Sequence, residues 1–95
     1  MTLITSADHS HVFTMGGYQT RGNPIFNLVN KGSETLDKKN YTTLGYTNGP
    51  GAPINKSRED PEKVFDFNNK LQRYQSLVPL ESETHGGEDV GKFRL

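Results

Sequence analysis

The chain has 95 residues, with 11 basic and 11 acidic side chains and a formal net charge of zero. This balance, without a stripe of Lys and Arg, argues against nucleic-acid binding, and no apolar run approaches the ~20 residues of a transmembrane helix. The absence of cysteine excludes disulfides and thiolate zinc sites, so only histidines and carboxylates could hold a metal. Val, Ile, Leu and Phe together number 21, against 10 Gly and 5 Pro, which predicts a loop-rich chain with little core of its own.

The first predicted element is a short strand over residues 2–5, which are β-branched or apolar. A polar cluster, Asp8-His9-Ser10-His11, follows this strand. In open α/β sheets, ligands bind at the carboxyl ends of strands, so the cluster is well placed for chemistry.

The middle of the chain predicts one strand between loops. Residues 18–40 contain a short cluster of apolar residues among polar and Gly residues, which is typical of a loop with at most a turn of helix. Residues 41–46 have the aromatic and β-branched content of a strand, and Asn48-Gly49-Pro50-Gly51 predicts a tight turn after it.

A helix is predicted to begin after Asp60. Asp is a favoured N-cap, Pro61 suits the first helical position, and Val64, Phe67 and Leu71 recur at helical spacing, which predicts one or two turns.

The last third of the chain predicts two extended segments around a second polar cluster. Residues 77–80 should be extended, because Pro79 disfavours the helical region for the residue before it. Residues 81–90 form the polar cluster, and residues 92–95 predict a closing strand.

The candidate metal ligands lie in the two polar clusters. Asp8, His9 and His11 offer one oxygen and two nitrogen donors, the types that zinc prefers. In a strand His9 and His11 would share a face, whereas in a turn Asp8 and His9 would converge on one ion, and spacing does not decide between them. The alternative is a solvated loop that binds nothing.

His85 is the third histidine, next to Gly86-Gly87, which lets backbone pass close to a ligand. Glu88 and Asp89 either orient this imidazole or are solvated charges. The sequence has no Cys nucleophile, Gly-x-Ser-x-Gly elbow or P-loop. Asn40 and Asn55 fit the N-glycosylation pattern.

Three ordered blocks resemble the animal-type alkaline phosphatases. They are Ser-Ala-Asp-His-Ser-His-Val-Phe-Thr-Met-Gly-Gly-Tyr-Gln-Thr-Arg-Gly-Asn-Pro-Ile-Phe-Asn-Leu at 6–28, the segment 41–51 ending in Gly-Tyr-Thr-Asn-Gly-Pro-Gly, and Val-Pro-Leu-Glu-Ser-Glu-Thr-His-Gly-Gly-Glu-Asp-Val at 78–90. The likeness is loose over 30–40 and 52–69. It lapses after residue 90, where Gly-Lys-Phe-Arg-Leu replaces the family's apolar strand.

The resemblance implies that residues 1–95 are a partial alkaline phosphatase domain from the C-terminal half of a longer α/β enzyme, not an autonomous core. The chain would contribute strands of the central sheet and, over about residues 22–80, the family's crown, a surface region of loops and a small sheet at the dimer interface and pocket entrance.

The resemblance also implies the roles of individual residues. Asp8 and His9 match ligands of the zinc that activates the family's serine nucleophile, and His85 matches a ligand of the second zinc, which stabilises the leaving oxygen and later activates water. His11 matches a histidine that orients a carboxylate ligand, and Tyr18 matches a tyrosine that reaches toward the partner subunit's active site.

The implied reaction is hydrolysis of phosphate monoesters through a phosphoserine intermediate, with two zinc ions per site and magnesium. The serine, the phosphate-binding arginine, the other zinc ligands and the magnesium ligands would lie outside this chain, so the chain alone should be inactive. The family implies an exported, often glycolipid-anchored homodimer, which suits the two glycosylation patterns. The alternative is a non-catalytic surface or dimerisation module that carries a metal-binding loop.

Overall fold

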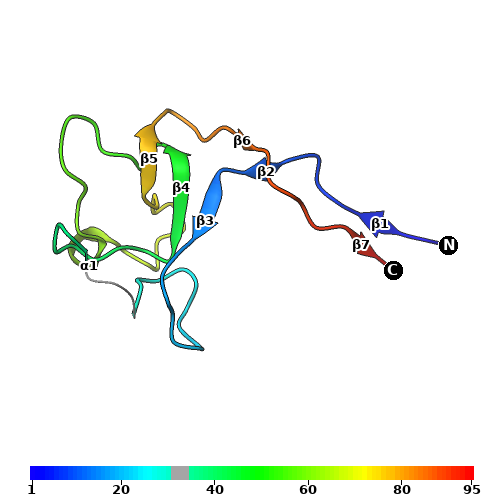
Figure 1. The fold of residues 1–95 in the computed structure, drawn as a ribbon, viewed down its shortest axis with the longest axis horizontal. Coiled ribbons are helices and arrows are strands. Elements are labelled where there is room, and N and C mark those ends of the chain that lie inside the picture. The colour runs from blue at the N-terminus through cyan, green and yellow to red at the C-terminus, as the bar shows by residue number, and fades with distance from the viewer. Residues whose placement is uncertain (31–34) are drawn as a thin grey trace.

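The computed structural model describes residues 1–30 and 35–95, which form an elongated molecule of 54 × 33 × 24 Å (Figure 1). A narrow part, here called the stalk, is formed by the two ends of the chain running side by side. A wider part, the head, contains the three-stranded sheet, the helix and the long loops.

The stalk consists of two short antiparallel strand pairs. β1 (Ile4–Thr5) pairs with β7 (Phe93–Arg94), and β2 (Ser10–His11) pairs with β6 (His85–Gly86). The predicted opening and closing strands are therefore confirmed, and they pair with each other. Both polar clusters consequently meet in the second pair, β2–β6.

The head is built on the sheet β3–β4–β5. The central strand β4 (Leu44–Gly49) pairs antiparallel with β3 (Phe13–Met15) and parallel with β5 (Ser76–Pro79). Opposite positions on β3 and β4 bring the rings of Phe13 and Tyr46 into edge contact at 5.6 Å, a favourable cross-strand pair. The extended segment predicted around Pro79 is confirmed as β5.

The predicted strand over residues 41–46 is displaced along the chain, because its first three residues pair with a loop instead. Val29 N–H donates to the Tyr41 carbonyl at 2.9 Å, and Thr43 N–H donates to the Asn27 carbonyl at 3.0 Å. β4 begins only at Leu44 and runs on to Gly49, where pairing with β5 ends. The predicted turn therefore lies at residues 50–51, after Gly49 with its positive φ of 135°.

The helix α1 (Pro61–Val64) begins as predicted. The Asp60 carboxylate accepts from Glu62 N–H, and Pro61 occupies the first turn. Of the one or two turns predicted, the structure has one, and after it nearby side chains accept hydrogen bonds from backbone N–H groups that a longer helix would use. The Asp66 carboxylate accepts from Asn68 N–H, and the Asn69 side chain accepts from Leu71 N–H, each at 3.0 Å.

The chain buries little apolar surface. Val29 and Leu44 are the buried large apolar side chains of the described ranges, and many others are exposed, Leu77 and Phe93 at 77% and 70%. The accessible surface of 7,724 Å² exceeds by about 2,200 Å² the value of about 5,500 Å² expected for a 10.6 kDa monomer. The expectation of a piece without an autonomous core is confirmed.

Described residues are mostly strands and loops with one four-residue helix, so the α/β class and the central-sheet position stay predictions about a complete fold. Within residues 1–30 and 35–95, no helix has the length and apolarity to cross a membrane.

Candidate functional site

The three histidines of the sequence converge where the stalk meets the head. His11 and His85 are partners in the β2–β6 ladder, although they are 74 residues apart. The rings of His9 and His85 stack with centroids 4.0 Å apart and planes 20° apart, and the His9 and His11 rings lie edge to face at 5.9 Å. Residues from both predicted polar clusters therefore form one imidazole group, here called the histidine cluster.

Asp8 and His9 present two metal-ligand atoms close together. His9 Nδ1 lies 2.9 Å from the Ser10 carbonyl oxygen, so a proton on Nδ1 leaves Nε2 with its lone pair free. His9 Nε2 is 3.8 Å from Asp8 Oδ1. Two donors on one tetrahedral zinc with bonds of 2.0–2.2 Å are about 3.3 Å apart, so a shift of about half an ångström brings both onto one ion.

His11 is held by a carboxylate from the far end of the chain. Its Nδ1 forms an ion pair with Glu83 Oε1, which arrives from the segment before β6. The other carboxylate oxygen, Glu83 Oε2, is buried and accepts no hydrogen bond within the described part of the chain. Sequence reasoning did not single out Glu83, because no local pattern links it to a histidine 72 residues away.

The acidic residues after His85 do not orient its ring in this structure. The Ser10 hydroxyl donates to the His11 carbonyl at 3.1 Å, and its polar interaction with Glu88 holds the pKa of that carboxyl below its ordinary value. A side chain at Gly86 would lie 2.5 Å from the His11 carbonyl oxygen, which shows how closely the two strands approach.

Across residues 1–30 and 35–95, no group of three or more His, Asp or Glu side chains is arranged around one metal position. The histidine cluster thus offers the donor pair from Asp8 and His9 and, beside it, the separate ring of His85.

The other sequence-predicted residues lie outside this cluster. Tyr18 is 77% exposed in the loop after β3. Asn55 is exposed with φ 54°, whereas Asn40 is half-buried and accepts a hydrogen bond from Tyr41 N–H at 2.8 Å. Asn55 is the more accessible of the two glycosylation candidates.

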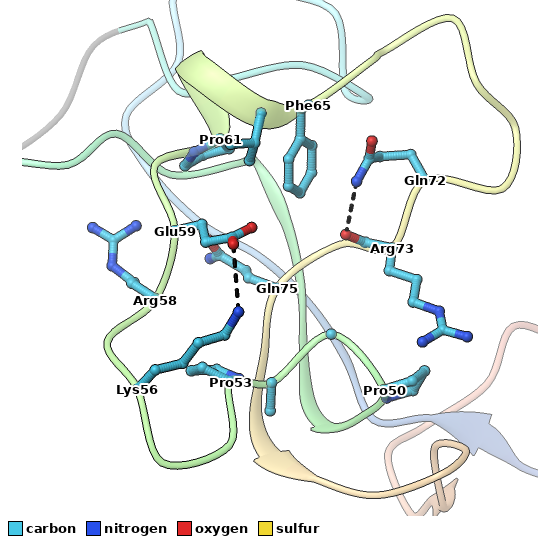
Figure 2. A pocket seen from close by; sticks show the side chains of 13 residues that line it. Pro50, Pro53, Lys56, Arg58, Glu59, Pro61, Phe65, Gln72, Arg73 and Gln75 are labelled. Carbon is cyan, nitrogen blue, oxygen red and sulfur yellow. Dashed lines mark hydrogen bonds and ion pairs between the residues drawn. The ribbon is translucent and has the colours of Figure 1, made fainter.

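A pocket of about 300 Å³ lies in the head (Figure 2). Pro61 and Phe65 line one side, and Pro50, Pro53 and Arg73 line others. The Lys56 ammonium pairs with Glu59 at 3.4 Å across it, and Arg58 is occupied by Asp37 at 2.7 Å. None of the three histidines lines this pocket.

Comparison with known proteins gives one consistent result. A family model described as alkaline phosphatase matches residues 1–94. The tissue-nonspecific isozymes of alkaline phosphatase from Homo sapiens and Gallus gallus are 48% identical over 93 and 90 residues, covering 98% and 95% of this chain. An alkaline phosphatase from Gadus morhua is 48% identical over 94 residues. The chain spans 17% of the length of the first two relatives and 19% of the third.

Proposed function

The chain belongs to the alkaline phosphatase family, and from this premise we propose that it forms part of the active site of a zinc-dependent phosphomonoesterase. Asp8 and His9 hold one zinc ion, and His85 contributes to the second. The observation that carries the proposal is the convergence of these residues from opposite ends of the chain in the histidine cluster.

The proposal assigns two ions rather than one. The Asp8 and His9 donor atoms are 3.8 Å apart, which is near the separation that a single zinc requires. The His9 and His85 rings stack with centroids 4.0 Å apart, so the imidazole assigned to the second ion lies directly beside the one assigned to the first. The proposal needs no three-ligand group within this chain, because it assigns two ligands to one ion and one to the other.

When bound, paired zinc ions stabilise the attacking and leaving oxygens of an in-line phosphoryl transfer. The chain's own residues prepare the site for them. The Ser10 carbonyl accepts from His9 Nδ1 and so directs Nε2 toward the ion, and Glu83 holds His11 beside His9. Such partners of ligating groups fix their orientation. Magnesium ligands and the serine nucleophile belong to parts of the enzyme outside this chain.

The proposal extends to the family's assembly and location. Residues 22–80 form the crown at a homodimer interface, with Tyr18 reaching the partner subunit. Support comes from the exposed ring of Tyr18 and from the excess surface of about 2,200 Å² beyond a compact monomer of this mass. The enzyme acts on phosphate monoesters outside the cell or at its surface, with glycosylation at Asn55 or Asn40 and a glycolipid anchor.

A grafted enzyme tests the zinc assignment. In the graft, residues 1–94 replace the matching stretch of the Homo sapiens tissue-nonspecific isozyme. His9→Ala and His85→Ala should each abolish most hydrolysis of p-nitrophenyl phosphate at alkaline pH and lower the zinc content, because each removes a ligand. His11→Ala should reduce the rate less, by about 10–100-fold, as for partners of ligands.

The controls are the unsubstituted graft and the parent enzyme, and excess zinc should partly restore the two ligand variants. If His9→Ala and His85→Ala retain the zinc content and rate of the unsubstituted graft, the metal assignment is wrong and the dimerisation-module interpretation gains.

A further inference from the structure

The side chain of Asn48 connects the head to the residue before His85. Asn48 lies near the end of β4, and its Nδ2 donates to Thr84 Oγ1 at 3.0 Å. In return, Thr84 N–H donates to Asn48 Oδ1 at 2.9 Å. Both functions of the carboxamide are therefore used on one residue 36 positions away, which fixes the orientation of the amide and the main chain at Thr84.

The segment between β5 and β6 is anchored to the same end of β4 at two points. Leu80 N–H donates to the Gly49 carbonyl at 3.2 Å, and this oxygen also accepts at 3.0 Å from the hydroxyl of Ser76, the first residue of β5. The next anchor along the segment is Asn48 on Thr84. The chain thus wraps around the end of β4 before it enters β6, as the orange trace between β5 and β6 shows (Figure 1).

The strand pair that carries His85 is too short to hold it alone. β2 and β6 pair over only two positions, and isolated two-stranded pairs are marginal in water. The added constraints on this pair are the ion pair of Glu83 with His11 and the two hydrogen bonds of Asn48 with Thr84. The contact of Glu83 with His11 connects the segment before β6 to β2. The hydrogen bonds of Asn48 with Thr84 connect the same segment to the sheet of the head.

We propose that Asn48 is a positioning residue for His85, through which the crown-like sheet sets the geometry of the second zinc ion. This inference rests on the proposed function, because it takes His85 to be a zinc ligand. Asn48 contacts neither the metal nor the substrate. It fixes the backbone at Thr84, one peptide bond before His85, so that the imidazole is presented at a constant distance from His9.

The chemistry of the amide sets which substitutions test this role. Asn48→Leu keeps the side-chain size and removes both hydrogen bonds. Asn48→Asp keeps an acceptor for Thr84 N–H and can accept from the Thr84 hydroxyl, so it should restore part of the function. On the other side, Thr84→Val removes the hydroxyl while keeping the shape, and Thr84→Ser keeps the hydroxyl.

The measurement is zinc affinity in the grafted enzyme, by competition with a chelator, together with the rate of p-nitrophenyl phosphate hydrolysis. Asn48→Leu should weaken one of the two zinc ions by about 10–100-fold, the range for residues that position ligands. Asn48→Asp should recover much of this loss of zinc affinity. Thr84→Val should weaken zinc binding less than Asn48→Leu does, and Thr84→Ser should bind zinc as tightly as the unsubstituted graft. Asn68→Leu is the matched control, since the Asn68 side chain has no hydrogen bond within the described ranges and is exposed.

The outcomes separate this inference from the proposed function. If His85→Ala loses zinc while Asn48→Leu binds both ions as tightly as the unsubstituted graft, Asn48 has no positioning role and the zinc assignment stands. If His85→Ala itself keeps both ions, the zinc assignment fails and the role of Asn48 fails with it. If Asn48→Leu does not fold, the Thr84→Val and Thr84→Ser pair decides, and equal zinc affinity in these two variants overturns the inference.

Discussion

Gly17 and its neighbour Gly16 provide a sharp test of how the loop after β3 is packed. Gly17 has φ +89°, and a Cβ there would lie 2.9 and 3.0 Å from the two methyl groups of Val29 and 2.7 Å from Gln19 Nε2. A Cβ at Gly16 would meet nothing within 4 Å, and φ there is not in the left-handed region. Gly17→Ala should therefore destabilise the loop, whereas Gly16→Ala should not.

The expected destabilisation by Gly17→Ala is the sum of two separate effects. The left-handed backbone costs a residue with a Cβ about 1–2 kcal/mol. Displacing Val29, one of the two buried large apolar side chains in the described ranges, adds about 1–2 kcal/mol of lost burial and strain. The sum is about 2–4 kcal/mol for Gly17→Ala, while Gly16→Ala should change stability by less than about 0.5 kcal/mol.

Hydrogen exchange in the grafted enzyme measures the loss of stability of this loop at individual amides. Val29 N–H donates to the Tyr41 carbonyl and Thr43 N–H to the Asn27 carbonyl, so these amides report opening of the loop. A loss of 2 kcal/mol corresponds to exchange about 30-fold faster. Equal exchange rates at these two amides in Gly17→Ala and Gly16→Ala would show that the packing of Val29 against Gly17 is not as described.

Two further predictions concern the chain alone and an ion pair of the head. Residues 1–95 expressed alone should be largely unfolded or aggregate, because the accessible surface is about 40% above that of a compact monomer. They should hydrolyse no p-nitrophenyl phosphate with added zinc and magnesium, because our proposal assigns the serine nucleophile to another part of the enzyme. A cooperative unfolding transition with dispersed amide NMR signals, or measurable turnover, would contradict this. Arg58 hydrogen-bonds to Asp37 and lowers the pKa of that carboxyl below 3.8. The stabilisation of the folded state by this ion pair is therefore complete at a pH above the pKa of Asp37 in the unfolded chain. It is lost as the pH falls through the lower pKa of Asp37 in the folded chain. Asp37→Asn should speed hydrogen exchange of residues 35–40 in the graft at pH 7, and the difference should shrink as the pH falls below the unfolded pKa of 3.8 and disappear once it passes the lower folded pKa. A difference independent of pH would refute the role of the ion pair.

The alkaline phosphatase resemblance was readable from residues alone, because three ordered blocks carry rare combinations such as Asp-His-Ser-His and Thr-His-Gly-Gly-Glu-Asp. Local elements were also readable where their causes lie within a few residues. Asp60 and Pro61 start a helix through a side-chain cap and a preset φ, and Pro79 keeps its neighbour extended.

Elsewhere the local sequence was compatible with more than one set of helix and strand bounds, and only the folded chain shows which bounds are adopted. The apolar spacing from Val64 to Leu71 allowed one or two helical turns, and the structure has one; beyond it the side chains of Asp66 and Asn69 accept from the N–H groups of residues 68 and 71. Likewise, residues 41–43 have the composition of a strand but pair with the loop at 27–29, so β4 begins only at Leu44.

The sequence alone restricted metal binding to the three histidines and the carboxylates, since the chain has no cysteine. It left open which of them meet. Only the tertiary structure brings His85 onto His9, Glu83 onto His11 and Thr84 onto Asn48, because these partners are 36 to 76 residues apart and their contacts depend on the pairing of β2 with β6 and on the end of β4. No pattern within one segment encodes such a pairing, since its stability comes from contacts between segments far apart in the chain.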